Sequence, residues 1–363
     1  MFVFAKTLLS NCNFVKTVRR PALFIIHCSL YIIQFAIHLS CSDNTDEAAQ
    51  FFLKGNVQLK KREYTEAIRF YTEAIAKKSD FADAYNNRGL AHFRNGNREI
   101  ALADYTRALE TDPDFAPAYL NRAEVRLETG DAPGSLQDLQ RIEKTYRDST
   151  FYQTRLADTF GQLNRPADAQ AAYDRALQLA PANAEALTNR GSLFFNQKQY
   201  PAAEADFRKA LTINPKQPES LNNLSLILAR QGKPAQALPL IDRAIDAQPA
   251  QPFYRNNKAY LLLLLNRNAE ALPLIEQSLR QNEQNAWAHR NLGLYHLGQN
   301  QPAPALTALK RAEQLDASVD ELYLLLGRAY FQTGNRAAAC EAWGRGATAG
   351  DERAKTERAL QCR

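Results

Sequence analysis

The stretch "YNNRG" at residues 85–89 returns along the chain in related forms, as "YLNRA" at 119–123, "LTNRG" at 187–191 and "HRNLG" at 289–293. In each form an asparagine stands two places before a small residue. The asparagines found in this setting are spaced by 34 residues or by twice 34: Asn87, Asn121, Asn189, Asn223, Asn257 and Asn291. A fixed period of this length is the signature of a repeat protein.

The 34-residue period holds without insertion or deletion from Ala48 to Arg353, which makes nine repeats. We number the positions of each repeat from 1 to 34, with Ala48 at position 1. Small residues recur at positions 8 and 20, and a large apolar residue occupies position 24 of every repeat. Position 24 is filled by Tyr71, Tyr105, Leu139, Tyr173, Phe207, Ile241, Ile275, Leu309 and Trp343.

This spacing predicts two helices in each repeat. Steps of three and four residues separate positions 4, 8 and 11, and also positions 20, 24 and 27, so each set lies on one helical face. Small side chains at positions 8 and 20 let the two helices approach closely, and the large residue at position 24 fills the space beside them. Turn residues such as Gly96 and Asn97 separate the helices. Prolines at position 32 end several second helices: Pro113, Pro181, Pro215 and Pro249.

At this point the chain resembles the tetratricopeptide repeat family, whose signature combines small, aromatic, alanine and proline positions on a 34-residue period. The resemblance implies an all-α fold, a right-handed α-solenoid superhelix of nine helix-turn-helix repeats over residues 48–353. Residues 354–363 are expected to form a C-terminal capping helix, because the last repeat otherwise exposes its apolar face. Residues 41–47 are expected to be a short linker. The chain departs from the family in lacking the usual tryptophan at position 4.

Residues 1–40 have the composition of an export leader. Arg19 and Arg20 precede an apolar-rich stretch at 22–39, and a polar, acidic run follows Cys41. The placement of this cysteine resembles a bacterial lipoprotein signal. The resemblance implies that Cys41 is acylated and that the mature chain is an exported, membrane-anchored lipoprotein of the cell envelope, facing the periplasm.

Two features of the leader leave alternatives open. His38 and Leu39 stand where a lipoprotein signal has leucine and a small residue. Eighteen apolar-rich residues can just span a bilayer, so an uncleaved signal anchor is the alternative, and it exports the repeats equally well. Met1 is the only methionine of the chain, and residues 1–17 make the leader unusually long. We therefore expect translation to start downstream of residue 1.

The charge and cysteine content agree with an exported repeat protein. Of the formal net charge of +6, four positive charges lie in the leader, which has no acidic residue, so the remainder carries +2. Positive and negative residues alternate there without a basic stripe, which argues against a nucleic-acid partner. Cys340 and Cys362 lie eleven residues before and after Asp351, where the chain turns. In an antiparallel hairpin they are at the same height, so we predict a disulfide formed in an oxidising compartment.

Nothing in the sequence indicates catalysis. It contains no phosphate-binding glycine-rich loop, no nucleophile elbow and no HExxH motif. His92, His289 and His296 fall at core or near-core positions of their repeats, and the acidic residues are predicted to lie on solvated helix faces. We expect no enzyme activity, no cofactor, no metal site and no small-molecule substrate.

The recurring asparagines belong to the face opposite the packing face. Positions 2, 5, 6, 9, 12 and 13 share that face of the first helix. First helices line the concave side in this family, so position 6 is expected to face the groove. A carboxamide both donates and accepts hydrogen bonds, which suits it to the backbone of an extended peptide. The array resembles the asparagine ladder of O-linked N-acetylglucosamine transferases. The alternative is that these amides bridge neighbouring first helices or face water.

Groove positions in repeats 7 and 8 are more apolar than elsewhere, which predicts the peptide-binding site there. The candidate residues beside the asparagines are Tyr260, Trp287, Arg290 and Leu294. The segment "YLLLLLN" at 260–266 is apolar on all sides, which one packing face does not require. The alternative is a helix buried on both sides. The sequence thus predicts a protein- or peptide-binding scaffold, and the second hypothesis is a structural spacer or assembly factor using its convex face or its ends.

Overall fold

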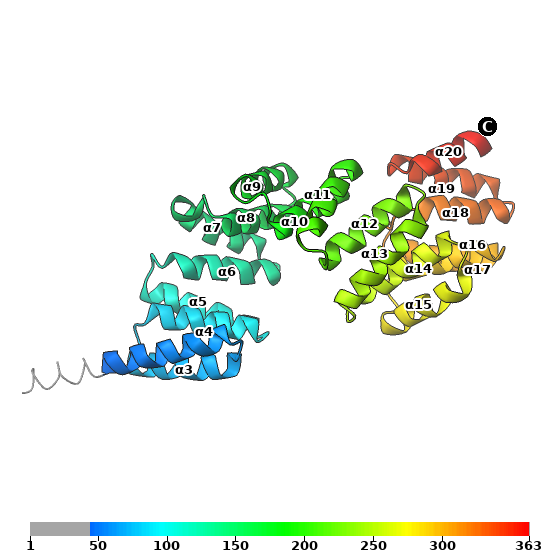
Figure 1. Cartoon of the computed structure of the whole chain (residues 1–363). Coiled ribbons are helices and arrows are strands. Elements are labelled where there is room, and N and C mark those ends of the chain that lie inside the picture. Colours follow the sequence, from blue (N-terminus) through cyan, green and yellow to red (C-terminus); the bar gives the residue numbers. More distant parts are fainter. Residues whose placement is uncertain (1–43, 363) are drawn as a thin grey trace, which may run out of the picture. The chain divides into compact units, whose positions relative to one another are not determined.

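The computed structural model describes residues 44–362 (Figure 1). Within this range the regular elements are α-helices and there is no β-strand, which confirms the predicted all-α class. The helices are, in order, residues 44–60, α3 (Tyr64–Lys77), α4 (Ala82–Arg94), α5 (Arg98–Thr111), α6 (Ala116–Glu128), α7 (Ala132–Tyr146), α8 (Thr150–Gln162), α9 (Pro166–Leu179), α10 (Ala184–Asn196), α11 (Tyr200–Ile213), α12 (Pro218–Arg230), α13 (Pro234–Ala247), α14 (Pro252–Leu264), α15 (Asn268–Gln281), α16 (Ala286–Gly298), α17 (Pro302–Leu315), α18 (Leu322–Gln332), α19 (Arg336–Thr348) and α20 (Glu352–Gln361).

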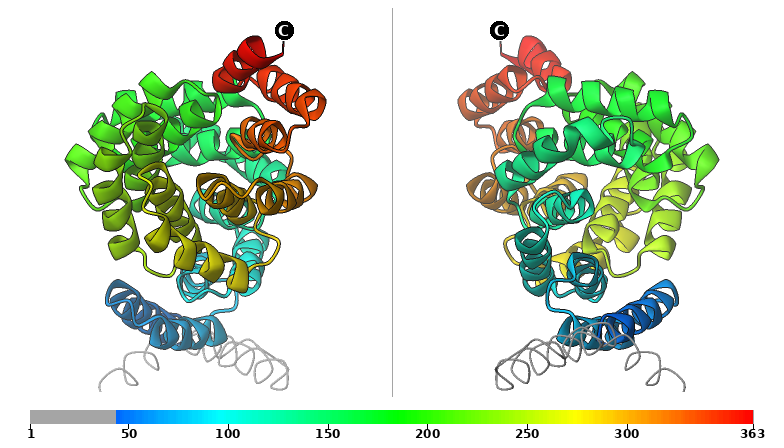
Figure 2. Two further views of the ribbon diagram at one scale, coloured as in Figure 1. Left: turned by 90° about the vertical axis from the view of Figure 1, so that its right-hand side faces the viewer. Right: turned by 90° about the vertical axis from the view of Figure 1, so that its left-hand side faces the viewer.

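The described residues form two compact bodies, one that ends at Arg147 and one that begins at Asp148, which we call the N-terminal and C-terminal bodies. The 34-residue register of the sequence continues through the boundary between the two bodies. A single superhelix across residues 147 and 148, and its handedness, stay predictions. In the side views of Figure 2, the helices of the C-terminal body follow a curve from α10 and α11 in green, through α14 and α15, to α20 in red.

Each repeat is an antiparallel pair with a constant register. The first helix, called the A helix, covers positions 1–13 in most repeats, and the second, the B helix, begins at position 17. Position 15, in the turn between them, has a positive φ in all nine repeats. Glycine and asparagine adopt this left-handed conformation easily, whereas Arg62 and Lys198 each adopt it at a cost of about 1–2 kcal/mol. The residues at position 15 are Arg62, Gly96, Gly130, Asn164, Lys198, Gly232, Asn266, Asn300 and Gly334.

Close packing of each pair confirms the role predicted for positions 8 and 24. A Cβ atom added to Gly191 would lie 2.7 Å from the Phe207 ring, and one added to Gly327 would lie 2.2 Å from the Trp343 indole. Such distances are too short for any real contact, so only a small residue fits at position 8. All nine residues at position 24 are buried. Burying a large apolar side chain contributes about 1.5–3 kcal/mol, so this layer stabilises every repeat along the stack.

The C-terminal end of the chain closes with α20, which begins two residues before the predicted start at 354. Asp351 caps it, because its carboxylate accepts hydrogen bonds from the backbone N–H groups of Arg353 and Ala354 at 2.9 and 3.2 Å. Ala354 is fully buried and packs in one cluster with Trp343. The helix thus covers the apolar face of the ninth repeat.

The leader, Cys41 and the expected translation start lie outside the described residues. Between residues 44 and 362, no helix is long and apolar enough to cross a membrane.

Candidate functional site

The six recurring asparagines all contact the A helix of the preceding repeat. In each of them the side-chain Nδ2 donates a hydrogen bond to that helix, over donor–acceptor distances of 2.8–3.2 Å. The donors and acceptors are Asn87 to Asn56, Asn121 to Asn86, Asn189 to Asp158, Asn223 to Ser192, Asn257 to Asn222, and Asn291 to Asn256.

The acceptor stands at one of two positions, and the residue at position 9 decides which. Three bonds go to a short polar side chain at position 9: Asn56, Asp158 and Ser192. The other three go to an asparagine at position 5: Asn86, Asn222 and Asn256. In those repeats position 9 holds a residue that is not a short acceptor: Leu90, Leu226 and Tyr260. Every amide therefore finds an acceptor one repeat earlier.

This geometry is one of the two alternatives that the sequence left open, namely bridging between neighbouring A helices. Asparagine costs a helix about 0.5 kcal/mol relative to alanine, and a net hydrogen bond contributes about 1 kcal/mol, so the bridge offsets the cost. Asn291 is fully buried, and its Oδ1 has no hydrogen-bond partner among the described residues. Contact of the partly exposed amides with a peptide stays a prediction.

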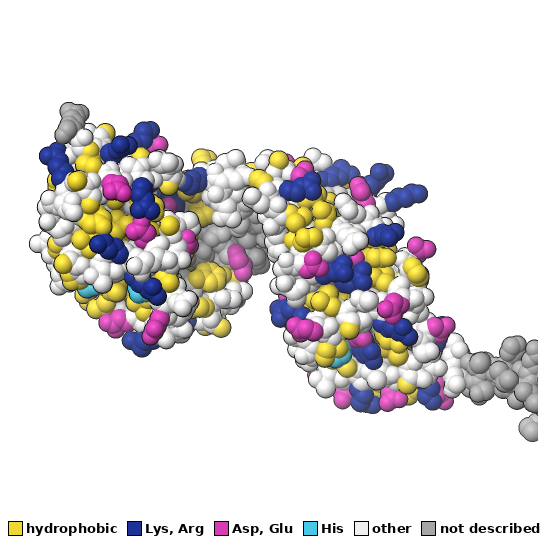
Figure 3. Space-filling view, turned by 180° about the vertical axis from the view of Figure 1, so that it is seen from behind, with side chains coloured by type: hydrophobic (Ala, Val, Ile, Leu, Met, Phe, Trp, Pro, Cys, Tyr) yellow, Lys and Arg dark blue, Asp and Glu magenta, His cyan; other side chains and the backbone are white. Residues whose placement is uncertain are grey.

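Several acidic residues are buried, so the prediction that they all lie on solvated faces is wrong. Asp104, Asp138 and Asp206, at position 23, are at most 6% exposed. Each receives two hydrogen bonds of 2.7–2.9 Å from the arginine at position 7 of its own repeat, as Arg190 shows with Asp206. Such bidentate pairs hold the A helix to the B helix, and both carboxylate oxygens of each aspartate accept from an arginine. On the face shown in Figure 3, exposed side chains of both charge signs are interspersed.

The three predicted core histidines do not meet. His92 is partly buried, and burial lowers its pKa. The His289 Nε2 lies 2.9 Å from the Glu283 carbonyl oxygen, and the His296 Nδ1 lies 2.8 Å from the Gln301 Oε1. Across residues 44–362, no three His, Cys, Asp or Glu side chains converge on a point where they could hold a metal ion.

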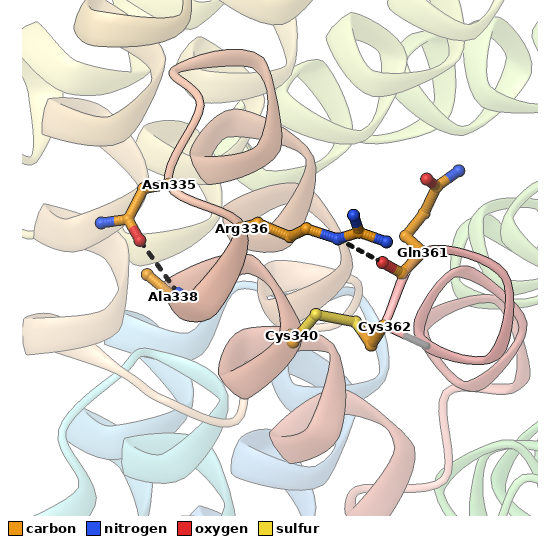
Figure 4. Close-up of a disulfide and its surroundings, with 6 residues drawn as sticks. All are labelled: Asn335, Arg336, Ala338, Cys340, Gln361 and Cys362. Carbon is orange, nitrogen blue, oxygen red and sulfur yellow. Dashed lines mark hydrogen bonds between the residues drawn. A yellow bond between two sulfur atoms is a disulfide. The ribbon is translucent and has the colours of Figure 1, made fainter.

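Cys340 and Cys362 form a disulfide in the structure (Figure 4). Their Cα atoms are 5.7 Å apart, and the bond joins α19 to the end of α20. Beside it, the Arg336 Nε donates a 2.7 Å hydrogen bond to the carbonyl oxygen of Gln361, as the figure shows. Together the two contacts fix the capping helix to the ninth repeat.

Exposed aromatic side chains recur at position 2 of A helices in the C-terminal body. Phe151, Phe253 and Trp287 expose 38%, 46% and 40% of their surface. Other repeats have no aromatic residue at position 2: it is Asp83 and Pro117 in the second and third repeats, and Glu185, Glu219 and Glu321 in the fifth, sixth and ninth. Phe253 and Trp287 lie in repeats 7 and 8, where the apolar groove positions were predicted, whereas Phe151 lies in repeat 4.

The residues predicted in repeats 7 and 8 lie together, but most are buried. Tyr260 and Arg290 are only 6% and 3% exposed, whereas the Trp287 ring reaches the surface. The Arg290 guanidinium lies 4.2 Å from the ring centroid of Tyr260 and 5.4 Å from that of Trp287. Leu294 is partly buried and packs against the core clusters. Residues 260–263 are all buried, so this helix is buried on both sides, the alternative given above.

Glu321 and Arg353 also belong to this region, and the sequence did not point to them because they lie in the ninth repeat. Glu321 is 7% exposed, and its Oε1 accepts a hydrogen bond of 2.8 Å from the Tyr260 hydroxyl. Its carboxylate also pairs with Arg353. Burial, together with the nearby Glu321 charge, raises the pKa of Tyr260, so its hydroxyl remains a donor. The Arg290 Nε and Nη1 are buried without a hydrogen-bond partner among the described residues.

A cavity of about 550 Å³ lies beside this group, within the C-terminal body. Its walls come from distant segments: the turn at Lys198, the end of α12, residues 317–323 and the turn before α20. The Lys198 Nζ donates a 2.6 Å hydrogen bond to the Ala349 carbonyl oxygen, and Arg230 pairs with Asp320. Glu321 and Arg353 line the cavity. Through its hydrogen bond with Glu321, the buried Tyr260 is in contact with the cavity wall.

Comparison with known proteins agrees with the helical repeat. Family models described as tetratricopeptide repeat match residues 154–218, 222–286 and 290–354, which is more than half of the chain, and residues 82–115. A further model, described as TPR repeat, matches residues 55–96. The chain belongs to the tetratricopeptide repeat family. No curated protein matches its sequence.

The solved structures that the chain matches have low sequence identity to it. The crystal structure of the APC/C hetero-tetramer Cut9-Hcn1 matches with a TM-score of 0.60 and 14% identity over 77% of this chain and 55% of that one. The chain thus spans about half the length of that protein. YrrB, a TPR protein with an unusual peptide-binding site, has a TM-score of 0.41 and 22% identity over 51% of this chain and 95% of its own. TTC0263, a thermophilic TPR protein of Thermus thermophilus, has a TM-score of 0.45 and 20% identity over 50% of this chain and 100% of its own.

Proposed function

We propose that this protein is a non-enzymatic scaffold of the cell envelope, which binds an extended peptide or partner segment on the A-helix face of its C-terminal body. The fold supports this proposal, because stacked helix pairs create extended binding surfaces rather than enclosed catalytic sites. The observation that carries it is the exposure of Phe253 and Trp287, by 46% and 40%, at the same position of adjacent repeats. Exposed aromatic rings beside buried polar groups are typical of the anchor points of protein interfaces.

A second candidate function is a spacer or assembly factor that binds through the end of its stack. The helix of residues 44–60, in the first repeat, exposes Leu53 and Val57 by 61% and 51%. Leu53 is at position 6, where the recurring asparagines bridge to a preceding repeat. An end contact would cover these side chains and leave the A-helix face of the C-terminal body free.

Site-specific photo-crosslinking separates the two functions. A photoreactive amino acid replaces Trp287, Leu53 or, as a control on a B helix, the exposed Lys209 in the full chain, which is expressed in its native host. We expect a discrete adduct from position 287 and none from position 209. Adducts from position 53 alone would favour the spacer function, and equal labelling at 287 and 209 would contradict binding on the A-helix face.

The envelope location rests on the leader and is tested at Cys41. We propose that this residue is acylated after export, so the protein stays with the membrane fraction. Cys41→Ala should abolish incorporation of a labelled fatty acid. Persistent labelling, or a protein found in the cytosol, would show that the leader has another role.

A further inference from the structure

The ninth repeat departs from the pattern at Glu321. The A helices from α4 to α16 begin at position 1, whereas α18 begins at Leu322, which is position 3. The helix starts late because Glu321 has a φ of 60°, in the left-handed region. A residue with a Cβ atom is strained there, so the contacts of its side chain must hold it in place.

Those contacts tie the segment before α18 to α12 and α14 of earlier repeats and to α20. The buried Glu321 carboxylate accepts the Tyr260 hydroxyl from α14 and pairs with Arg353 of α20. The neighbouring Asp320 pairs with Arg230 at the end of α12. The Arg353 side chain is 53% exposed, so it can keep its partner if Glu321 moves outward.

Arg290 lies next to this contact, and its buried guanidinium is only partly hydrogen-bonded. Its guanidinium is 4.2 Å from the centre of the Tyr260 ring, and its Nε and Nη1 have no hydrogen-bond partner within the described part of the chain. Burying an arginine with unpaired N–H groups is unfavourable, and native structures rarely leave such groups unsatisfied. A carboxylate is the complementary group, because it accepts two N–H bonds from one guanidinium.

We propose that Arg290 and the Tyr260 hydroxyl form a subsite for a carboxylate of the bound peptide, and that Glu321 blocks this subsite in the structure described. This inference rests on the proposed peptide-binding function and names its ligand as an extended segment with an acidic side chain. Entry of the ligand displaces Glu321 from Tyr260, and Glu321 retains Arg353. The exposed Trp287 ring then packs against an apolar neighbour of the acidic residue.

Capped peptide pools test this even though the partner's sequence is not identified. Two labelled heptamer pools carry either Glu or Gln at the central position, with all other positions randomised, and bind to the full chain in solution. Acrylamide quenching of tryptophan fluorescence reports on occupancy at Trp287, because the other tryptophan, Trp343, is only 1% exposed. We expect the Glu pool to bind about tenfold more tightly, as a charge-assisted hydrogen bond requires.

Substitutions at the subsite should weaken the preference for Glu, whereas removal of the Glu321 side chain should strengthen binding of the Glu pool. Arg290→Gln should abolish the preference for Glu, and Tyr260→Phe should reduce it without changing a charge. Glu321→Gly should increase binding of the Glu pool several-fold, because glycine accepts the left-handed conformation and removes the competing carboxylate. The control Arg280→Gln removes an exposed positive charge on α15 and should leave the preference unchanged. Circular dichroism confirms that each variant is folded.

The outcomes separate this inference from the proposed function. If both pools bind equally and protect Trp287, the groove binds peptides but the carboxylate subsite does not exist. If neither pool binds the native chain or the Glu321→Gly variant, the subsite and peptide binding at this face are both refuted. If the preference for Glu survives in Arg290→Gln, the carboxylate binds elsewhere and the inference fails.

Discussion

The hydroxyl of Tyr105 provides a test of the packing reasoning, because the same residue type at the same repeat position has a partner in other repeats. The Tyr71 hydroxyl donates a 2.7 Å hydrogen bond to the Asn56 Oδ1, and the Tyr173 hydroxyl bonds to Asp158. Both acceptors stand at position 9. In the second repeat position 9 is Leu90, and the buried Tyr105 hydroxyl has no hydrogen-bond partner in residues 44–362.

Phenylalanine should therefore lower stability at Tyr71 and Tyr173, but not at Tyr105. Tyr71→Phe loses a net hydrogen bond, so the free energy of unfolding should fall by about 1 kcal/mol. Tyr173→Phe removes a bond to a carboxylate, and the loss should be about 1.5–3 kcal/mol. Tyr105→Phe removes a hydroxyl whose unpaired burial costs about 1–3 kcal/mol, so stability should stay level or rise by about 1 kcal/mol. The three rings keep their packing, which makes the hydroxyl the only difference.

Native-state hydrogen exchange measures these changes locally, since a repeat array of this length need not unfold in one step. Amides of α4 and α5 report on Tyr105, and those of α3 report on Tyr71. A double-mutant cycle with Leu90→Asn supplies the missing acceptor and should give a coupling of about 1 kcal/mol with Tyr105→Phe. If Tyr105→Phe destabilises as much as Tyr71→Phe, the hydroxyl has a partner and the reasoning from position 9 is refuted.

Three further predictions concern stability. Gly191→Ala should lower the free energy of unfolding by about 1–3 kcal/mol, because the added Cβ atom would overlap the Phe207 ring. Gly161→Ala places its Cβ atom in open space and should raise the free energy of unfolding by up to about 1 kcal/mol. Urea unfolding of the two variants measures both changes. Reducing the disulfide, or Cys340→Ser, should lower the stability of the last repeat by about 3 kcal/mol, and a thiol assay on the denatured, unreduced protein should find neither Cys340 nor Cys362 free. Burial lowers the pKa of His92 below its unfolded value of 6.5, so its contribution to stability is present above that pH and is lost on acidification; His92→Gln should flatten the pH dependence of unfolding between about pH 7.5 and 5.

The helix pairs were predictable because their cause is local. A residue's place in the 3.6-residue period determines which face of its helix it occupies. The small residue at position 8 and the large one at position 24 therefore identify the packing face whatever the geometry of the superhelix. Gly191 and Phe207 meet as expected for this reason, and the prolines at position 32 follow the ends of B helices.

The role of the asparagines was only half predictable. Their position on the A helix, and the choice between a groove ligand and an interhelical bridge, followed from the sequence. The alternation of acceptors between positions 5 and 9 is also written there, since Leu90 is accompanied by Asn86 and Leu226 by Asn222. This alternation can be recognised only once the structure shows that positions 5 and 9 both face the next A helix.

The sequence by itself determined the fold class, the register of the repeats and the face that each side chain occupies, because these depend on the chain within one repeat and its neighbour. Only the tertiary structure decided that Tyr260 meets Glu321, that Arg230 meets Asp320, and that two nitrogens of Arg290 lack a hydrogen bond within residues 44–362. Contacts of this kind join residues far apart in the sequence, 90 positions for Arg230 and Asp320 and 151 for Lys198 and Ala349. They depend on the small rotation between successive repeats, which accumulates along the C-terminal body and is the sum of many side-chain contacts that no periodic pattern specifies.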